Sequence, residues 1–182
     1  MLKSFLFSFI LFFLSEVFAQ KESHLFVNSS IDMGNRPITS IIKDKNSFLW
    51  VGTFGGGLKK YDGVEVKTYR HDIYDDAALA SSIIHDLMID QAGQLWVGSN
   101  DGLHLYNSDK DNFLRFLNNF HGKPIKVHAI NPLDDDNILV GTHQSGLFVI
   151  NILTKSITEV ELSKSIEKNN FLIHDIKRDT SK

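Results

Sequence analysis

The sequence contains no cysteine and only three prolines in 182 residues. Without cysteine there is no disulfide framework, no thiolate nucleophile and no cysteine-ligated zinc or iron–sulfur site. An excess of one charge is missing as well, because 19 basic residues stand against 22 acidic ones. Nucleic-acid-binding domains carry an excess of basic residues, which this sequence lacks, so we expect no nucleic-acid partner. The hydrophobic share of 42% suffices for a packed core and argues against a disordered chain.

The aromatic residues that are present are distributed unevenly. Six of the 14 phenylalanines lie in the first 19 residues, where an apolar run extends from Phe5 to Leu14 behind a lysine. The run stops at Glu16, short of the roughly 20 apolar residues that span a bilayer. Val17 and Ala19 have the spacing that signal peptidase prefers. We predict that residues 1–19 are a cleaved signal peptide, and that the mature chain is exported to the periplasm without further membrane contact.

The remainder of the chain repeats one unit. Leu49-Trp50-Val51-Gly52 returns as Leu95-Trp96-Val97-Gly98 and, more faintly, as Leu139-Val140-Gly141. The aligned glycines are 46 and 43 residues apart, and a Gly-Leu pair follows each of them. A period in the forties with four strands per repeat is the signature of β-propeller blades. We expect structural roles for the residues that mark the repeat: Trp50, Gly52, Gly57, Trp96, Gly98, Gly102, Gly141 and Gly146.

Each repeat is predicted to form four short antiparallel strands, because β-branched and aromatic runs alternate with turn residues. For repeats one, two and three, the first strands are predicted at Ile38 to Lys43, Ile83 to Ile89 and Lys126 to Ile130. The third strands are predicted at Leu58 to Tyr61, Leu103 to Tyr106 and Leu147 to Ile150. The fourth strands are predicted at Val64 to Tyr69, Phe113 to Leu117 and Ser156 to Leu162. Second strands contain the repeated Trp or its equivalent. The Gly-Leu glycines are expected at positive φ, and the strand glycines at close approaches. We expect the tryptophans to pack between neighbouring units.

The spacing apolar-x-x-Asp-x-x-Gly-x-Leu-Trp-Val-Gly followed by Gly-Leu resembles the two-component regulator propeller repeat. Thr39 to Asp62 and His85 to Asn107 match this pattern, and the connector Tyr69 to Ser81 and the lead-in His24 to Arg36 resemble the segments that flank it. The third copy departs from it at Leu133 and Leu139. The resemblance implies the sensory ectodomain of a hybrid two-component histidine kinase. It places kinase activity in further domains, so we expect no enzymatic activity in this chain.

The repeat divides the chain into an all-β, incomplete array of three blades and part of a fourth. The predicted segments are a signal peptide (1–19), a lead-in strand and turn (20–37), blade one (38–80), blade two (81–125), blade three (126–170) and the start of blade four (171–182). The fourth marker, His174-Asp175-Ile176, is followed by only six residues. Because propellers close with about four to eight blades, we expect the chain to be an N-terminal fragment, or alternatively a short chain that completes a ring by oligomerising.

Eight histidines raise the question of a metal site. His85, His128 and His174 share one repeat position, and equivalent positions in consecutive blades point toward a common axis. Thr39 occupies that position in the first copy, and metal-ligand spacings are missing. We therefore expect these histidines to be satisfied by the backbone, and we expect neither a metal nor another cofactor. The acidic run at 134–137 lacks the spacing of a calcium loop and is expected to be a solvated turn.

The geometry of a blade indicates where a ligand would bind. Turns after the second and fourth strands emerge at the same end, and they combine aromatic rings with amides and carboxylates, a mixture that suits a glycan or another small polar molecule. The candidate ligand-binding residues are Phe54, His71, Tyr74, Asn100, Asp101, Phe120, His143 and Gln144.

Two functions remain open at this point. One is an extracytoplasmic sensor propeller of a two-component system that binds a small-molecule or glycan ligand. The alternative is an exported propeller enzyme, such as a polysaccharide lyase or hydrolase, or a carbohydrate-binding protein.

Open blade edges invite self-association. We predict that the mature chain alone elutes as oligomers in gel filtration or is poorly soluble. A sharp monomeric peak together with cooperative thermal unfolding would contradict this prediction.

Overall fold

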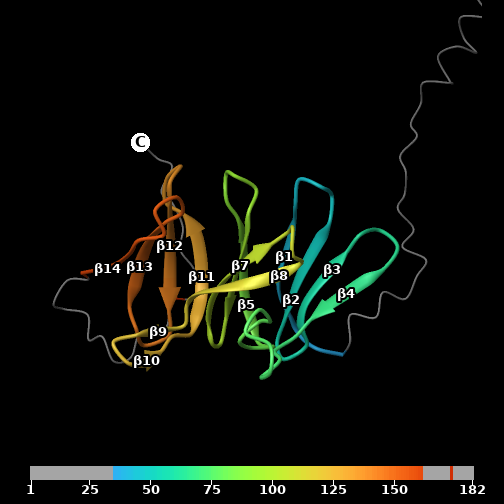
Figure 1. Cartoon of the computed structure of the whole chain (residues 1–182), viewed down its shortest axis with the longest axis horizontal. Coiled ribbons are helices and arrows are strands. Elements are labelled where there is room, and N and C mark those ends of the chain that lie inside the picture. Colours follow the sequence, from blue (N-terminus) through green and yellow to red (C-terminus); the bar gives the residue numbers. More distant parts are fainter. Residues whose placement is uncertain (1–34, 162–172, 174–182) are drawn as a thin grey trace, which may run out of the picture. The chain divides into compact units, whose positions relative to one another are not determined.

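The computed structural model describes residues 35–161 and residue 173. The predicted signal peptide, most of the lead-in segment and most of the start of a fourth blade therefore lie outside the described residues. The described part contains three four-stranded antiparallel sheets and one two-stranded sheet, which confirms the all-β fold with propeller blades (Figure 1). Among the described residues there is no helix long and apolar enough to cross a membrane.

Each four-stranded sheet is one blade, with its strands paired in chain order. Blade 1 comprises β1 (Ile38–Lys43), β2 (Leu49–Thr53), β3 (Gly57–Tyr61) and β4 (Val66–Tyr69). Blade 2 comprises β5 (Ile84–Ile89), β6 (Leu95–Ser99), β7 (Gly102–Asn107) and β8 (Asn112–Leu117). Blade 3 comprises β11 (Val127–Pro132), β12 (Asn137–Thr142), β13 (Leu147–Asn151) and β14 (Ile157–Val160). A hairpin of β9 (Asn119–Phe120) and β10 (Lys123–Pro124) lies between blades 2 and 3 in the chain.

Most predicted strands agree with the observed ones, and the differences have local causes. β4 begins at Val66 rather than Val64 because Asp62 Oδ1 accepts hydrogen bonds from the backbone of Val64 and Glu65, which closes a turn. The β9–β10 hairpin was not predicted. His121 and Gly122 both have positive φ there (51° and 78°), the combination that a type I′ hairpin turn requires.

In blades 1 and 2 the tryptophan of the second strand donates a hydrogen bond to an aspartate. Asp44 Oδ2 accepts from Trp50 Nε1 at 2.8 Å, and Asp90 Oδ2 accepts from Trp96 Nε1 at 2.9 Å. The other oxygen of each carboxylate accepts backbone N–H groups of the turn that follows the first strand. One side chain thus closes the turn and satisfies a buried indole. Blade 3 has Leu139 at the tryptophan position and forms its sheet without this contact.

Neighbouring blades meet where a glycine of one faces a first-strand side chain of the next. A Cβ on Gly52 would lie 2.8 Å from Ile84 Cγ2, and a Cβ on Gly98 would lie 2.8 Å from Val127 Cγ1. Both distances are shorter than side chains tolerate, so only glycine permits this packing. The predicted close approach is confirmed for these two glycines. The turn glycines Gly57, Gly102 and Gly146 have φ of 83°, 115° and 88°, as predicted.

The core consists of two apolar clusters. One contains Trp50 with blade 1 and blade 2 side chains, and the other contains Trp96 with side chains from blades 2 and 3. Trp50 lies edge-on to Tyr106 of β7 at 4.8 Å between ring centroids, which confirms that it packs between two blades. The side chains of both tryptophans are buried, as the burial of large apolar surface favours.

The chain connecting blades 1 and 2 is anchored by a buried histidine. Leu79 of this connector is fully buried, and the backbone N–H of Ala80 donates to His104 Nε2 on β7 at 3.0 Å. Burial lowers the pKa of His104 to about 4, so that the neutral ring remains an acceptor at neutral pH. The connector is therefore a fixed part of the fold.

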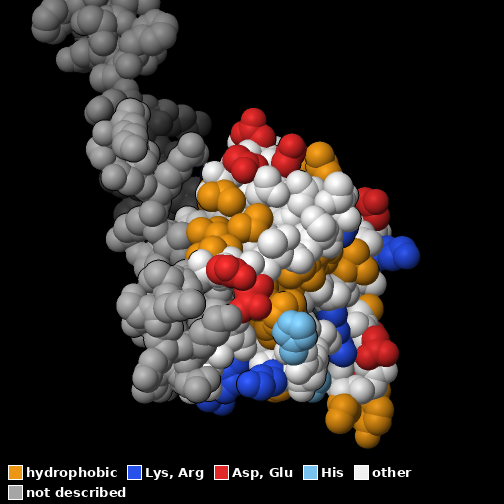
Figure 2. Space-filling view, turned by 90° about the vertical axis from the view of Figure 1, so that its left-hand side faces the viewer, with side chains coloured by type: hydrophobic (Ala, Val, Ile, Leu, Met, Phe, Trp, Pro, Cys, Tyr) orange, Lys and Arg blue, Asp and Glu red, His pale blue; other side chains and the backbone are white. Residues whose placement is uncertain are grey.

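Equivalent first-strand residues differ in exposure from blade to blade. Ile41 of blade 1 is 57% exposed, whereas Leu87 of blade 2 is 6% exposed and Ile130 of blade 3 is 3% exposed. Within the described residues a preceding blade covers β5 and β11 but not β1. On the blade 3 side, hydrophobic side chains are interspersed with acidic and basic ones (Figure 2). The exposed side chain of Ile41 occupies the position that a preceding blade buries in blades 2 and 3.

We predict that Gly98→Ala destabilises the fold by about 1–3 kcal/mol, because the added methyl group overlaps Val127 Cγ1. Urea denaturation of both single variants and of Gly98→Ala/Val127→Ala measures this. In the Val127→Ala background the same substitution should cost at least about 0.5 kcal/mol less, since the overlapping atom is gone. Equal costs in both backgrounds would show that the contact does not limit the packing.

Candidate functional site

Each blade carries an irregularity near the start of its first strand. The pairing register shifts around Thr39 in β1, around His85 in β5 and around His128 in β11, so that one residue is inserted at the same repeat position in all three blades. Such bulges redirect a side chain and are frequent beside functional sites. In blades 2 and 3 the redirected side chain is an imidazole.

The imidazole rings of His85 and His128 contact each other, and that of His128 also contacts the ring of His143. The rings of His85 and His128 are stacked with centroids 3.8 Å apart, and His143 meets His128 edge-on at 5.7 Å. His85 also interacts with the side chain of Asn100. These four half-buried residues, His85, Asn100, His128 and His143, are called the imidazole cluster below.

The fold positions the cluster through one repeated backbone contact. Phe54, Asn100 and His143 follow the second strand of their blades, and the backbone N–H of each donates at 2.9–3.0 Å to the carbonyl of the residue preceding the first strand. This bond holds the turn after the second strand beside the bulge. Asn100 is thereby held beside His85, and His143 beside His128.

Burial determines the charge state of His85. Desolvation lowers the pKa of His85, and electrostatic interactions with Lys126 and His143 lower it further, whereas the contact with Asn100 opposes the shift. His85 is therefore neutral at neutral pH. Its Nε2 atom is buried without a hydrogen-bond partner, which contradicts the expectation that the backbone satisfies this histidine. Among the described residues no group of three or more His, Asp or Glu side chains could hold a metal ion.

Two of the predicted ligand-binding residues, Asn100 and His143, belong to the imidazole cluster. Phe54 is 51% exposed at the equivalent position of blade 1. Asp101 and Gln144 are exposed in the turns that follow β6 and β12. These five residues line the end of the blades that carries the turns after the second strands, here called the lower end after its place in Figure 1.

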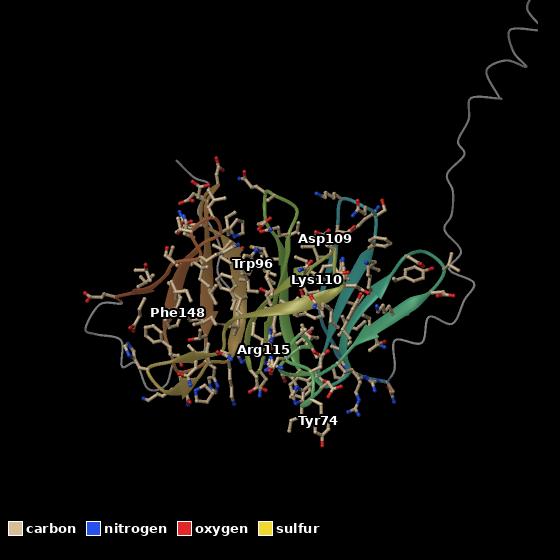
Figure 3. The ribbon with its side chains drawn as sticks, viewed as in Figure 1. Tyr74, Trp96, Asp109, Lys110, Arg115 and Phe148 are labelled. Carbon is tan, nitrogen blue, oxygen red and sulfur yellow. The ribbon has the colours of Figure 1, made fainter. Side chains whose placement is uncertain are left out.

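The predicted residues of the fourth-strand connectors are dispersed. Tyr74 is 96% exposed and projects from the lower end (Figure 3). His71 Nδ1 lies 3.1 Å from the carbonyl oxygen of Leu79, so this ring braces the connector. Phe120 packs edge-on against Phe148 at 4.8 Å and belongs to the margin of the core. The prediction missed His85 and His128 as site residues, although their shared repeat position was the signal that could have identified them.

Comparison with known sequences identifies the repeat. Residues 32–55 and 78–101 match the model of the two component regulator propeller. Two segments of this chain are two-component regulator propeller repeats. Each spans the first and second strands of its blade, so the matched segments contain both aspartate–tryptophan contacts. The search of curated proteins found no significant match.

Solved structures share the fold at low sequence identity. An extracellular domain from B. thetaiotaomicron, described as part of a hybrid two component system, superposes with a TM-score of 0.56 at 19% identity over 76% of this chain. Virginiamycin B lyase from Staphylococcus aureus superposes with a TM-score of 0.52 at 13% identity over 69% of this chain. The chain spans 19% of the first relative and 41% of the second. These likenesses show the fold alone.

We predict opposite effects of two neighbours on the pKa of His85. Lys126→Gln removes a positive charge and should raise this pKa, whereas Asn100→Leu removes a stabilising contact and should lower it. Imidazole NMR titration measures both, with Lys110→Gln in the β7–β8 turn as the control. Because the folded state holds the lower pKa, the His85 contribution to stability is lost as the pH falls through 6.5 toward that value. Shifts of the same sign in both variants would contradict the assigned contacts.

Proposed function

We propose that this protein is the extracytoplasmic, ligand-sensing propeller region of a two-component signalling system. The two matched repeats are the observation that carries this proposal. The fold of an extracellular domain described as part of a hybrid two component system supports it. In this proposal the chain binds the ligand, and histidine kinase activity resides in other domains of the signalling protein.

The ligand site is proposed at the lower end, around the imidazole cluster. The neutral imidazole of His85 donates one hydrogen bond and accepts another, and the amide of Asn100 does both. The exposed ring of Phe54 adds an apolar surface at the equivalent position of blade 1. Paired donors and acceptors beside an aromatic ring suit a polar, uncharged molecule such as a saccharide. Nε2 of His85 is buried and has no hydrogen-bond partner, so the region contains an unsatisfied polar group.

The same fold also occurs in a lyase, so the fold does not separate a sensor from an exported propeller enzyme. The distinction is chemical, because a sensor releases its ligand unchanged whereas a lyase or hydrolase releases cleaved product. Both outcomes can be measured on one sample.

We predict that a screen of neutral mono- and oligosaccharides identifies a ligand that raises the Tm of the chain by several degrees, since ligand at 100 times its Kd adds about 2.7 kcal/mol to the free energy of unfolding. His128→Ala and Asn100→Leu should remove the shift. Lys110→Gln in the β7–β8 turn, outside the imidazole cluster, is the matched control and should retain it.

The bound saccharide is then recovered and analysed for cleavage. Unchanged saccharide supports the sensor, and cleaved product would replace it with the enzymatic function. Retention of the shift in both cluster variants, or a screen in which no saccharide changes Tm, would overturn the proposed site.

A further inference from the structure

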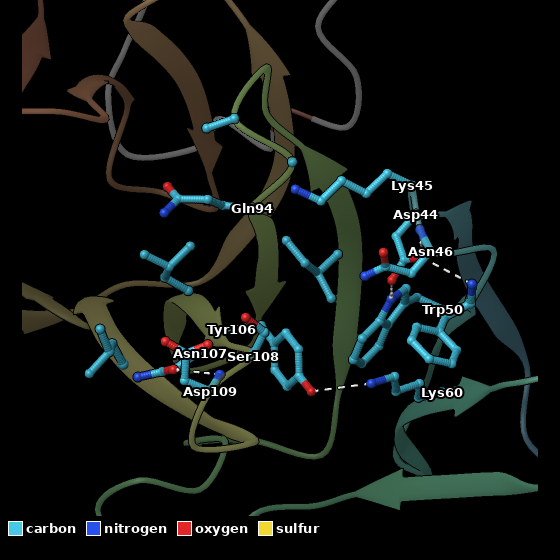
Figure 4. Close-up of a pocket in the computed structure, with 16 residues that line it drawn as sticks. Asp44, Lys45, Asn46, Trp50, Lys60, Gln94, Tyr106, Asn107, Ser108 and Asp109 are labelled. Carbon is cyan, nitrogen blue, oxygen red and sulfur yellow. Dashed lines mark hydrogen bonds between the residues drawn. The ribbon is translucent and has the colours of Figure 1, made fainter.

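A separate cleft of about 560 Å³ lies between blades 1 and 2, away from the imidazole cluster. It is formed by the turns that follow β1, β5 and β7, together with the side chains of Trp50, Lys60 and Tyr106 (Figure 4). None of the predicted ligand-binding residues lines it. Its volume lies within the range of small-molecule sites.

Lys60 is the exception to the repeat at this place. The equivalent residue of blade 2 is Leu105, which is 6% exposed, and that of blade 3 is Val149. Two blades thus place an aliphatic side chain where blade 1 places an ammonium group. Positions that break the pattern of their own fold are the expected places for function. Among the three described blades, only blade 1 has a lysine at this position.

The contacts of Lys60 hold its ammonium in one place. Lys60 Nζ lies 4.1 Å from the ring centroid of Phe48, 5.1 Å from that of Trp50 and 5.4 Å from that of Tyr106. It also donates to the Tyr106 hydroxyl oxygen at 3.3 Å (Figure 4). Cation–π attraction from three rings and one hydrogen bond fix the charge without neutralising it.

Tyr106 is itself held in place, so the support of Lys60 is rigid. The Tyr106 hydroxyl donates to Asp111 at 2.5 Å, and the same carboxylate accepts from Tyr69 and from Lys67. Burial would raise the pKa of Asp111, but these hydrogen bonds lower it to about 2, so Asp111 remains an ionised acceptor. The network joins β4 of blade 1 to blade 2.

A second ammonium group lines the same cleft. Lys45 extends over Gly93, whose missing side chain leaves room for it. Within the described part of the chain neither Lys45 nor Lys60 forms a salt bridge. The nearby carboxylate of Asp44 already accepts from Trp50 Nε1 and from two backbone N–H groups. Among the described residues the cleft thus presents two ammonium groups that form no salt bridge, and the carboxylate of Asp109 in the β7–β8 turn also lines it.

We propose that this inter-blade cleft binds a small polar ligand that carries an oxyanion, which Lys60 and Lys45 recognise. Carboxylates and phosphates share the required chemistry, because both present charged oxygen acceptors to ammonium donors. The site is independent of the proposed saccharide site, since it uses other residues and another part of the blades.

Three probes with one carbon skeleton separate the two anion classes from uncharged binding: glycerol, glycerate and glycerol 3-phosphate. Each is titrated into the ¹⁵N-labelled chain while the two indole N–H signals are followed by NMR. Trp50 borders the cleft, whereas Trp96 has the equivalent aspartate contact and does not line it, so the second indole is an internal control. We expect at least one anionic probe to shift the Trp50 signal saturably and glycerol to leave it unchanged.

Lys60→Leu installs the residue that blade 2 carries and should weaken anion binding at least 10-fold. Lys45→Met is the second variant and tests the site without altering the aromatic rings of Phe48, Trp50 and Tyr106 around Lys60. Lys123→Met on β10, outside the cleft, should bind as the unaltered chain does. Equal shifts of Trp50 and Trp96, an equal response to glycerol, or unchanged affinity in both cleft variants would overturn the proposal. Because the imidazole cluster is intact in these variants, the result is independent of the saccharide test.

Discussion

The structure depends on the missing side chain of one strand glycine in each of blades 1 and 2. Gly52 and Gly98 allow a branched first-strand residue of the next blade to approach to a distance that any Cβ would obstruct. This approach brings the first strands of consecutive blades together, and the aromatic contacts between blades follow from it. Trp50 reaches Tyr106 of the next blade only because the two sheets are this close. Close-packed interiors transmit such a constraint to all of their neighbours.

Close stacking also creates the two regions where chemistry concentrates. At the lower end it brings the bulged residues of blades 2 and 3 into contact, so that one imidazole from blade 2 and two from blade 3 become a cluster. Between blades 1 and 2, the aromatic rings of Phe48, Trp50 and Tyr106 surround Lys60. Blades 2 and 3 carry an aliphatic residue at the position of Lys60. In both regions the repeated blade structure places the residues, and residues that differ between repeats provide the polar groups.

Much of the fold could be predicted because its determinants are local and repeated. The Trp-Val-Gly runs and the Gly-Leu turns fix strand lengths, and the positive φ of Gly57, Gly102 and Gly146 follows from turn chemistry alone. The β9–β10 hairpin was missed because His121, a residue with a side chain, adopts positive φ at its turn. The start of β4 depends on two backbone hydrogen bonds to the side chain of one aspartate, which no periodicity reveals.

The candidate site was only partly predictable for a related reason. The sequence by itself determined the repeat, the four-stranded blades and the end at which the turns after second strands emerge, because strand alternation and turn residues act over a few positions. Only the tertiary structure decided that His85 stacks on His128, that Phe120 turns into the core, and that Lys60 lies among three aromatic rings. The stacking of His85 on His128, the packing of Phe120 on Phe148 and the contact of Lys60 with Tyr106 join residues of different blades or hairpins. Their distances depend on how closely successive sheets pack. Spacing along the chain does not contain that information.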